Sequence, residues 1–314
     1  MPRATGARSQ LAAAFESTYG TAPASGYLQM PFVRSTLGSE QPLEDSELLG
    51  YGRDPLDADQ GPISAGGDIV VPIDAESFGI WLKGAFGTPT TTEVTGVYTH
   101  VFESGSWNLP SLSIERAFPE VPYYPMNSGC KVDRLSWTMQ RSGKLQATVG
   151  LIAQGESTAT STQAGTPTEY SIDSRFNHFQ GAIMLDGSAM GNVISNELTY
   201  SNNLDRVETI RADGKIDGAD EGMGMLSGRT VVRFAETTLL TKASAGTPVA
   251  LVFSHTIDAD ASLTITVPRV LLPKPKVQIE GPAGVQVTYQ WQAAQQSNGD
   301  AMVTATLVNE VESY

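Results

Sequence analysis

The residues of this sequence that could do chemistry are concentrated in one acidic loop, RADGKIDGADEG at 211–222. Four carboxylates stand among its glycines, a composition found in calcium-binding loops. An EF-hand loop beginning at Asp213 would need an oxygen ligand at its third position and a glutamate at its twelfth, where the sequence has Lys215 and Gly224. The flanking residues have the composition of strands, whereas an EF-hand needs helices. We therefore interpret the loop as acidic for a reason other than calcium.

The three histidines and the single cysteine do not form a catalytic or metal-binding motif. None of His100, His178 and His255 has a second histidine or a cysteine at the spacing of a zinc site. Cys130 has no partner for a disulfide, which favours a reducing compartment. The sequence also lacks a Gly-x-Ser-x-Gly nucleophile motif and a glycine-rich phosphate loop before a helix. These observations predict a protein that is not an enzyme and binds no metal or cofactor.

The composition is globular and strongly acidic. Hydrophobic residues make up 40% of the 314 residues, which is enough for a core, and the formal net charge is −14. Such a charge repels nucleic acid. It has two interpretations: solubility, or a surface to which nucleic acid must not adhere. The first residues lack the pattern of a signal peptide and no apolar run is long enough for a membrane helix, so we expect no membrane contact.

An internal repeat is the strongest organisational feature of the chain. The segment DADQGPISAGGDIVVPIDAE at 57–76 is similar to GADEGMGMLSGRTVVRFAE at 218–236. Five identical residues recur at a constant offset of 161 positions: Asp59 and Asp220, Gly61 and Gly222, Gly67 and Gly228, Val70 and Val231, Val71 and Val232. This spacing predicts a tandem duplication.

Weaker likenesses continue the repeat downstream. The sequence suggests three correspondences: 87–89 with 246–248, 111–116 with 262–267, and 134–149 with 286–307. A Ser/Thr/Gly-rich stretch without apolar periodicity lies between the two copies and has the composition of a linker. The predicted organisation is an N-terminal arm at 1–26, a first domain at 27–156, a linker at 157–175 and a second domain at 176–314.

Strands dominate both predicted domains, with one short helix in each. Leu135, Trp137 and Met139 alternate with polar residues, and the segments 285–293 and 301–307 alternate in the same way and are expected to form a hairpin. Because side chains on a strand point to alternate faces, this pattern indicates a sheet that is buried on one side only. The other face is mostly amides and hydroxyls, which is either an ordinary solvated surface or a specialised one.

Several segments in the same order resemble the major tail tube proteins of long, flexible-tailed bacteriophages. They are FESTYGTAP at 15–23, the acidic loop before a strand, the helix AESFGIWLKGAFG at 75–87, and VGLIAQGE at 149–156. The resemblance covers nearly the whole chain, and STYGTAP is its most specific part. It implies a mainly β fold of two tandem tail-tube-type β-sandwich domains, each with a flanking short α-helix, whose strands join an inner β-barrel in a ring.

The family forms its tube from stacked rings of six units. Because this chain is predicted to contain two units, the resemblance implies homotrimeric rings that stack into a tube and form the conduit for DNA. The implied partners are further copies of the chain, a tape-measure protein in the lumen, and tail terminator and distal tail proteins at the ends. The implied location is the phage virion, after assembly in the bacterial cytoplasm. The alternatives are a two-domain β-sandwich binding module, such as an adhesin, and a β-sandwich hydrolase.

The resemblance also assigns two sets of candidate functional residues. By alternation, the residues expected to face the lumen are Ser136, Thr138, Gln140, Gln146, Thr148, Gln286, Thr288, Gln290, Gln292, Thr304 and Thr306. The loops at 37–67 and 202–228 match the family loop that reaches the neighbouring ring. Their charged residues expected at inter-ring contacts are Glu44, Asp45, Arg53, Asp54, Asp57, Asp59, Arg211, Asp213, Lys215, Asp217, Asp220 and Glu221.

Overall fold

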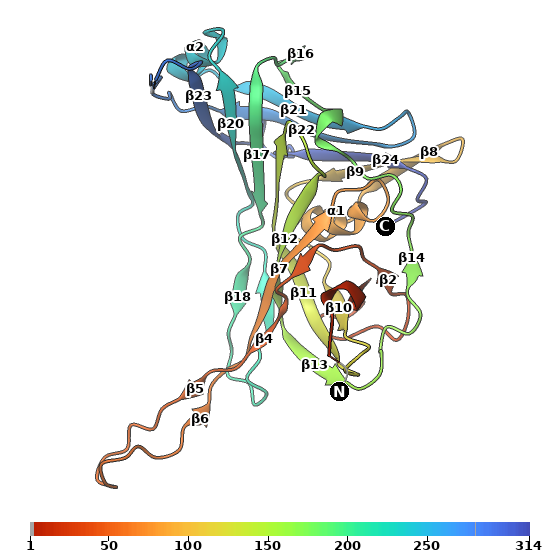
Figure 1. Ribbon diagram of the computed structural model, residues 1–314, viewed down its shortest axis with the longest axis vertical. Coiled ribbons are helices and arrows are strands. Elements are labelled where there is room, and N and C mark those ends of the chain that lie inside the picture. Colours follow the sequence, from red (N-terminus) through yellow and green to blue (C-terminus); the bar gives the residue numbers. More distant parts are fainter. Residues whose placement is uncertain (1–2, 280) are drawn as a thin grey trace.

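A computed structural model describes residues 3–279 and 281–314 as a mainly β molecule with two short α-helices. Its largest element is an antiparallel sheet that runs along the long axis of the molecule (Figure 1). The strands of this central sheet are, in spatial order, β3 (Arg34–Ser35) with β4 (Gly38–Glu40), β7 (Ser64–Pro72), β12 (Gln146–Ala153), β11 (Tyr124–Gln140), β17 (Val193–Ser201), β20 (Met225–Arg233) and β23 (Gln286–Ala293). The pairing of β11 with β17 makes the sheet continuous between the two halves of the chain.

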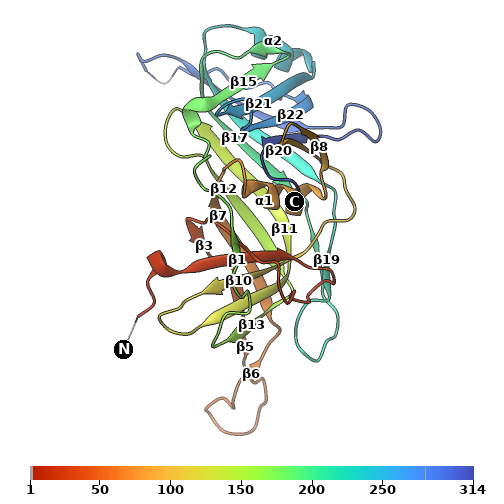
Figure 2. The ribbon, with the colours of Figure 1, turned by 90° about the vertical axis from the view of Figure 1, so that its right-hand side faces the viewer.

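A second layer covers one face of the central sheet, with first-half strands at one end and second-half strands at the other (Figure 2). The first-half strands are β1 (Gln10–Phe15), β2 (Leu28–Gln29), β10 (Leu112–Ala117), β13 (Gly155–Ala159) and β14 (Thr168–Glu169). The second-half strands are β15 (Gly181–Leu185), β16 (Ser188–Ala189), β21 (Val249–Thr256), β22 (Ser262–Leu271) and β24 (Thr304–Asn309). The hairpin β8 (Thr90–Val94) and β9 (Val97–Glu103) belongs to the first half but pairs with β24.

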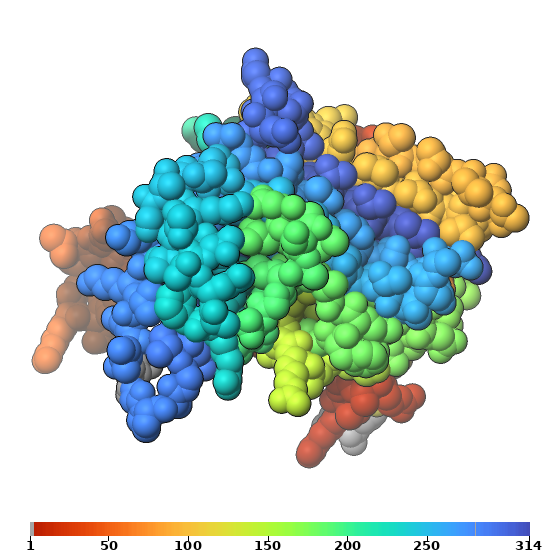
Figure 3. Space-filling view, turned by 90° about the horizontal axis from the view of Figure 1, so that it is seen from above, coloured from red at the N-terminus to blue at the C-terminus, as the bar shows by residue number. Residues whose placement is uncertain are grey.

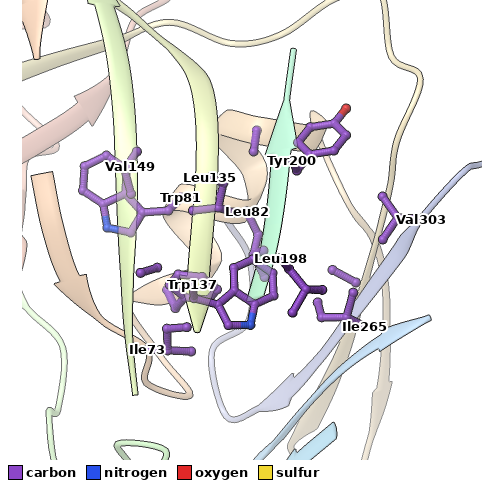
Figure 4. Packing of buried hydrophobic residues seen from close by; sticks show 14 of the residues in the cluster. Ile73, Trp81, Leu82, Leu135, Trp137, Val149, Leu198, Tyr200, Ile265 and Val303 are labelled. Carbon is purple, nitrogen blue, oxygen red and sulfur yellow. The ribbon is translucent and has the colours of Figure 1, made fainter. Parts of the chain in front are cut away.

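The core lies between these layers and is one continuous cluster through both halves. Trp81 and Leu82 of helix α1 (Phe78–Phe86) pack beside Leu135 and Trp137 of β11 (Figure 4). Eight of the nine residues of α1 are buried, whereas only Leu239 and Ala243 are buried in α2 (Thr238–Ala245). No helix in the described part of the chain is long and apolar enough to span a membrane.

The strand pairing of the first half recurs in the second half. β7 and β20 have nine residues each, and their first residues, Ser64 and Met225, differ by 161 positions. Each pairs with a preceding strand at the same relative register. Arg34 faces Val70, and Ser195 faces Val231. The hairpins before them also match: β5 (Leu43–Glu44) pairs with β6 (Asp59–Gln60), and β18 (Asp205–Val207) pairs with β19 (Gly218–Asp220).

The recurrence continues after the helices at a second offset. Gln146 of β12 faces Pro72, and Gln286 of β23 faces Arg233, so these two strands differ by 140 positions. β11 lies beside β12 as the end of β22 lies beside β23. β10 pairs with β11 as β21 pairs with β22, and both pairs have a register shift at their matching ends. The counterparts after the helices are therefore β10 and β21, β11 and β22, β12 and β23.

This register corrects two predictions. The sequence likenesses of 111–116 with 262–267 and of 134–149 with 286–307 are wrong by one strand, because all of these strands share the same alternation of apolar and small polar residues. The hairpin expected between 285–293 and 301–307 does not form. β23 pairs with β20 and β22, whereas β24 pairs with β22 and β9.

Gly67 in the first half and its counterpart Gly228 in the second are glycines for the same steric reason. A Cβ atom on Gly67 would lie 2.5 Å from the carbonyl oxygen of Thr36, and one on Gly228 would overlap the carbonyl oxygen of Glu197 and the ring of Trp291. Thr36 and Glu197 are themselves 161 positions apart. Thr36 lies between β3 and β4, beside β7, and Glu197 lies on β17, beside β20. Close approach of the backbones, required twice, explains why glycine recurs.

We expect Gly228→Ala to lower the free energy of unfolding by about 1–3 kcal/mol, since the added methyl group overpacks the contact with Trp291. The control is Gly191→Ala, where the new Cβ would have no atom within 4 Å. Chemical denaturation of the two variants measures the difference. Equal stabilities would show that β17 and β20 are not packed as closely as described.

Part of the predicted N-terminal arm forms a strand of the second layer. Residues 10–15 form β1, which pairs with β10. The Glu16 carboxylate that follows accepts hydrogen bonds from Ser111 Oγ at 2.7 Å, Ser113 Oγ at 2.6 Å and the Gly20 amide at 2.8 Å. These bonds hold the turn of FESTYGTAP against the second layer, which is a structural reason for the most specific motif of the chain.

The predicted linker is also anchored to the first half. The buried Glu115 of β10 accepts hydrogen bonds from Thr162 Oγ1 and the Gln163 amide, both at 2.6 Å, and from the Ala164 amide at 3.2 Å. Farther along, β14 pairs in parallel with β2. The linker therefore follows a defined path across the second layer.

Candidate functional site

The central sheet leaves one broad face exposed, on the side away from the core. Along β11, the side chains of Leu135, Trp137 and Met139 are buried, and those of Thr138 and Gln140 are exposed. β12 and β23 continue the same alternation. One row across this face runs from strand to strand through Val70, Thr148, Ser136, Thr199, Ser227 and Gln292. We call this surface the exposed sheet face.

The structure brings most of the predicted lumen residues together on this face. Those on β11, β12 and β23 are Ser136, Thr138, Gln140, Gln146, Thr148, Gln286, Thr288, Gln290 and Gln292. Thr304 and Thr306 are elsewhere: they lie on β24, which pairs with β22 and β9 in the second layer. The alternation correctly indicated which side of each strand is polar, but it did not indicate which sheet the last strand joins.

The charged residues of the exposed sheet face are partly matched. Arg134 Nη2 of β11 lies 3.1 Å from Asp68 Oδ1 of β7, across the intervening strand β12. Glu197 of β17 is directly opposite Arg229 of β20 in the strand register. Arg233 lies at the end of the face. Sequence reasoning did not select Asp68, Glu197 or Arg229, because β7, β17 and β20 contain apolar residues that hide the alternation. The large negative charge of the chain is therefore located away from this face.

The two edges of the central sheet are open in the monomer. In the described residues, β3 and β4 pair with β7 and with no strand on their other side. At the opposite edge β22 pairs with β23 only through Val270 and Leu271, although its counterpart β11 pairs with β12 up to Trp137. Pro273 and Pro275 follow Leu271 and lack the N–H groups that extend a strand ladder, which is the reason β22 ends early.

The first of the two predicted inter-ring loops projects from one end of the sheet. It forms the β5–β6 hairpin, which extends beyond the body of the molecule (Figure 1). Its candidate residues are Glu44, Asp45, Arg53, Asp54, Asp57 and Asp59. None of the ion pairs found among the described residues includes these side chains. The hairpin also exposes apolar side chains that sequence reasoning did not select, among them Leu48 and Leu49.

The second loop instead folds against its own chain. The Ile63 amide donates a hydrogen bond to the Gly214 carbonyl at 2.8 Å, and Ile216 is buried beside Ile152. Lys131 Nζ lies 2.7 Å from Glu221 Oε1. Burial raises the pKa of Glu221 and is the largest single effect, but the hydrogen bond from Lys131, the backbone hydrogen bonds and the Lys131 charge together outweigh it, so the net shift of this pKa is downward.

The charges at the tip of the second loop also pair with one another. Arg211 lies 2.9 Å from Asp213 and 2.6 Å from Asp217. The hydrogen bond from Arg211 holds the pKa of Asp213 well below its usual range. Of the candidates in this loop, Lys215 and Asp220 have no such ion pair among the described residues. The acidic composition of 211–222 is thus largely accounted for by contacts within the chain.

The described residues, 3–279 and 281–314, contain no group of three or more His, Cys, Asp or Glu arranged to hold a metal ion. His100 is buried and hydrogen-bonded to Thr91, Asn309 and the Val311 carbonyl. Burial lowers the pKa of His255 to about 4, so that its imidazole is neutral in the folded protein. Burial likewise raises the pKa of Cys130, which makes its thiol a packing group.

Comparison with known families decides the identity of this architecture. The model of a family described as phage tail tube protein matches residues 6–293. The chain belongs to the phage tail tube protein family. No curated protein matches it significantly. Membership makes this tail tube protein a structural component of a phage tail and a virion protein.

Proposed function

We propose that this tail tube protein is a tandem duplication, that three chains close into a ring of six near-equivalent units, and that stacked rings form the conduit for DNA ejection. The recurrence of strand pairing at offsets of 161 and 140 positions is the observation that carries the proposal. Two units with the same register can occupy equivalent places in one ring. The proposed units are 27–156 and 176–314, with 1–26 and 157–175 as arm and linker.

The strand pairing at the joint between the two halves of one chain indicates how neighbouring chains would pair in the ring. Inside the chain, Arg134–Gln140 of β11 pairs with Ser195–Ser201 of β17. The counterpart of β17 is the free edge formed by β3 and β4, and the counterpart of this part of β11 is the segment 274–279. Pairing of this segment with β3 and β4 of the next chain would repeat the internal joint. A closed ring would also leave the central sheet without exposed edges.

The exposed sheet face is suited to line the lumen of such a ring. Its side chains are mostly hydroxyls and amides, and its charges Arg134 and Asp68 neutralise each other. A strongly basic wall would bind DNA by releasing counterions and would retain it. On this face Arg134, Arg229 and Arg233 outnumber Asp68 and Glu197, and the proposed chain-to-chain joint would add Lys274 and Lys276, so the lumen would carry a modest net positive charge although the chain as a whole is acidic.

The remaining partners are part of the same proposal. Copies of the chain stack through the β5–β6 hairpin, a tape-measure protein occupies the lumen before DNA does, and terminator and distal tail proteins close the two ends. Assembly takes place in the host cytoplasm. Family membership supports these contacts in general, and the polar lumen face and the projecting hairpin support the first two in particular.

Electron microscopy of the assembled protein tests the proposal. We expect tubes built of rings with threefold symmetry, each ring showing six similar lobes. Rings of six chains with true sixfold symmetry would contradict the duplication. A protein that stays monomeric at high concentration and forms no tubes in virions would contradict the conduit itself.

A further inference from the structure

A pocket lies at the end of the central sheet opposite the β5–β6 hairpin. It has a volume of about 630 Å³ and is formed by the turn after β11, the short helix at His178–Gln180, β15, and the start of β17. Figure 3 views this end from above, with the green 181–195 segment beside the yellow-green turn after β11. Gln140, Ser195 and Gln286 line the pocket and belong to the exposed sheet face, so the pocket opens on that side.

The lining of the pocket combines apolar side chains with neutral polar ones and two arginines. Its apolar lining includes Phe179, Met190 and Ile194, and the side chain of Phe179 is 78% exposed. Arg141 and Arg233 also line it, and no aspartate or glutamate does. A hollow lined by an exposed phenylalanine and two cations is a surface that suits an acidic, apolar segment.

The β5–β6 hairpin is such a segment. Leu48 is 67% exposed, Leu49 is 92% exposed and Tyr51 is 71% exposed. Between residues 41 and 62 the chain has six carboxylates and one arginine. Apolar side chains that project this far on a hairpin gain nothing in the monomer, and they would be removed from water by insertion into a hollow.

The positions of the two features make them reachable only between copies. β7 runs away from the hairpin, starting at Ser64 beside it and ending at Pro72, and Pro72 pairs with Gln146 at the far end of the sheet. The pocket includes Gln286, whose pairing with Arg233 marks that same far end. The two features are thus separated by the length of the central sheet. Head-to-tail stacking brings the hairpin of one copy to the pocket of the next, and such a contact repeats indefinitely along an axis.

We propose that the pocket at the end of β11 and β17 receives the tip of the β5–β6 hairpin, with Leu48, Leu49 and Tyr51, from a copy of the chain in the adjacent ring. The apolar tip enters the pocket, and the hairpin carboxylates face Arg141 and Arg233. This contact rests on the proposed stacking of rings, and it specifies the surface on the receiving copy. It is repeated at least three times in each ring interface, so that a modest single contact is multiplied.

Covalent capture tests the contact directly. The chain carrying Leu49→Cys and Phe179→Cys is allowed to assemble and is then oxidised, and the products are separated without reduction. Cys130 is buried and does not compete. We expect a ladder of covalently linked chains, because each copy donates one cysteine and receives another. The control pairs Phe179→Cys with Val94→Cys, an exposed apolar position on the β8–β9 hairpin, and should give no ladder.

A second pair of variants tests the stacking of rings independently of ring formation. Leu48→Asp with Leu49→Asp should give intact rings that do not stack, whereas Val94→Asp, on the β8–β9 hairpin, should give normal tubes. Tubes that form normally from the Leu48 and Leu49 variant, or a cysteine variant that forms tubes without a ladder, would overturn the hairpin contact and leave the ring proposal standing. Absence of rings from the unmodified protein would overturn both.

Discussion

Introducing carboxylates at Val277 and Ile279 should abolish ring closure while leaving the folded monomer unchanged. Continuing the offset of 140 positions, Val277 is the counterpart of Trp137 and Ile279 of Met139. Trp137 and Met139 are buried at the joint between the halves, but Val277 is 39% exposed and Ile279 is 82% exposed. These two apolar side chains therefore lack the strand that covers their counterparts. In the proposed ring, the next chain supplies it.

The expected effect is large because each aspartate would be buried without a partner. Burying an unpaired polar or charged group costs several kcal/mol, and the cost recurs at all three joints of a ring. Val277→Asp with Ile279→Asp should therefore remain monomeric when the unmodified chain forms rings, as measured by light scattering and electron microscopy. Its melting temperature should match that of the unmodified monomer, because both positions face water there.

Gln278→Asp is the matched control for this prediction. Gln278 lies between the two apolar residues and is the counterpart of Thr138, whose side chain is on the exposed sheet face. A carboxylate at 278 would point into the lumen and should permit ring closure. Rings formed equally well by both variants would show that segment 274–279 is outside the joint between chains.

Lysines on the exposed sheet face should slow the release of DNA. Thr148 and Thr288 occupy equivalent places on β12 and β23, so Thr148→Lys with Thr288→Lys adds six lysines to each proposed ring. A stacked tube would present these cations along its whole length. Each contact with a phosphate releases counterions and changes the logarithm of the affinity for DNA by about 0.9 per tenfold change in salt. DNA should consequently move slowly at low salt and faster at high salt.

The measurement is the rate of DNA ejection from virions that carry the variant, at two or more salt concentrations. Thr304→Lys with Thr306→Lys is the control, because it adds the same charges on β24, outside the exposed sheet face. It should leave the rate unchanged. If the variant at 148 and 288 ejects DNA at the normal rate, this face does not line the conduit.

The two hairpins differ in a way that their similar composition does not indicate. Both were expected to reach the next ring on the strength of similar position and charge. The second contains Ile216, which is buried, and Arg211, which forms ion pairs with two neighbouring carboxylates. The first contains Leu48 and Leu49, which remain exposed. Whether an apolar side chain in a loop is buried depends on which surface packs against it, and the local sequence does not specify that surface.

The sequence by itself determined the family, the β class, the repeat before each helix, and the polar side of β11, β12 and β23. These are local properties: a strand alternates with a period of two, and a glycine recurs where two backbones come close. Only the tertiary structure decided that β24 does not pair with β23, that β17 pairs with β11, and that β22 ends at Leu271. Alternation specifies which side chains a strand buries but not which strand lies beside it. That choice depends on pairing between residues far apart in the chain, and on Pro273 and Pro275, whose missing N–H groups have no effect until a neighbouring strand needs them.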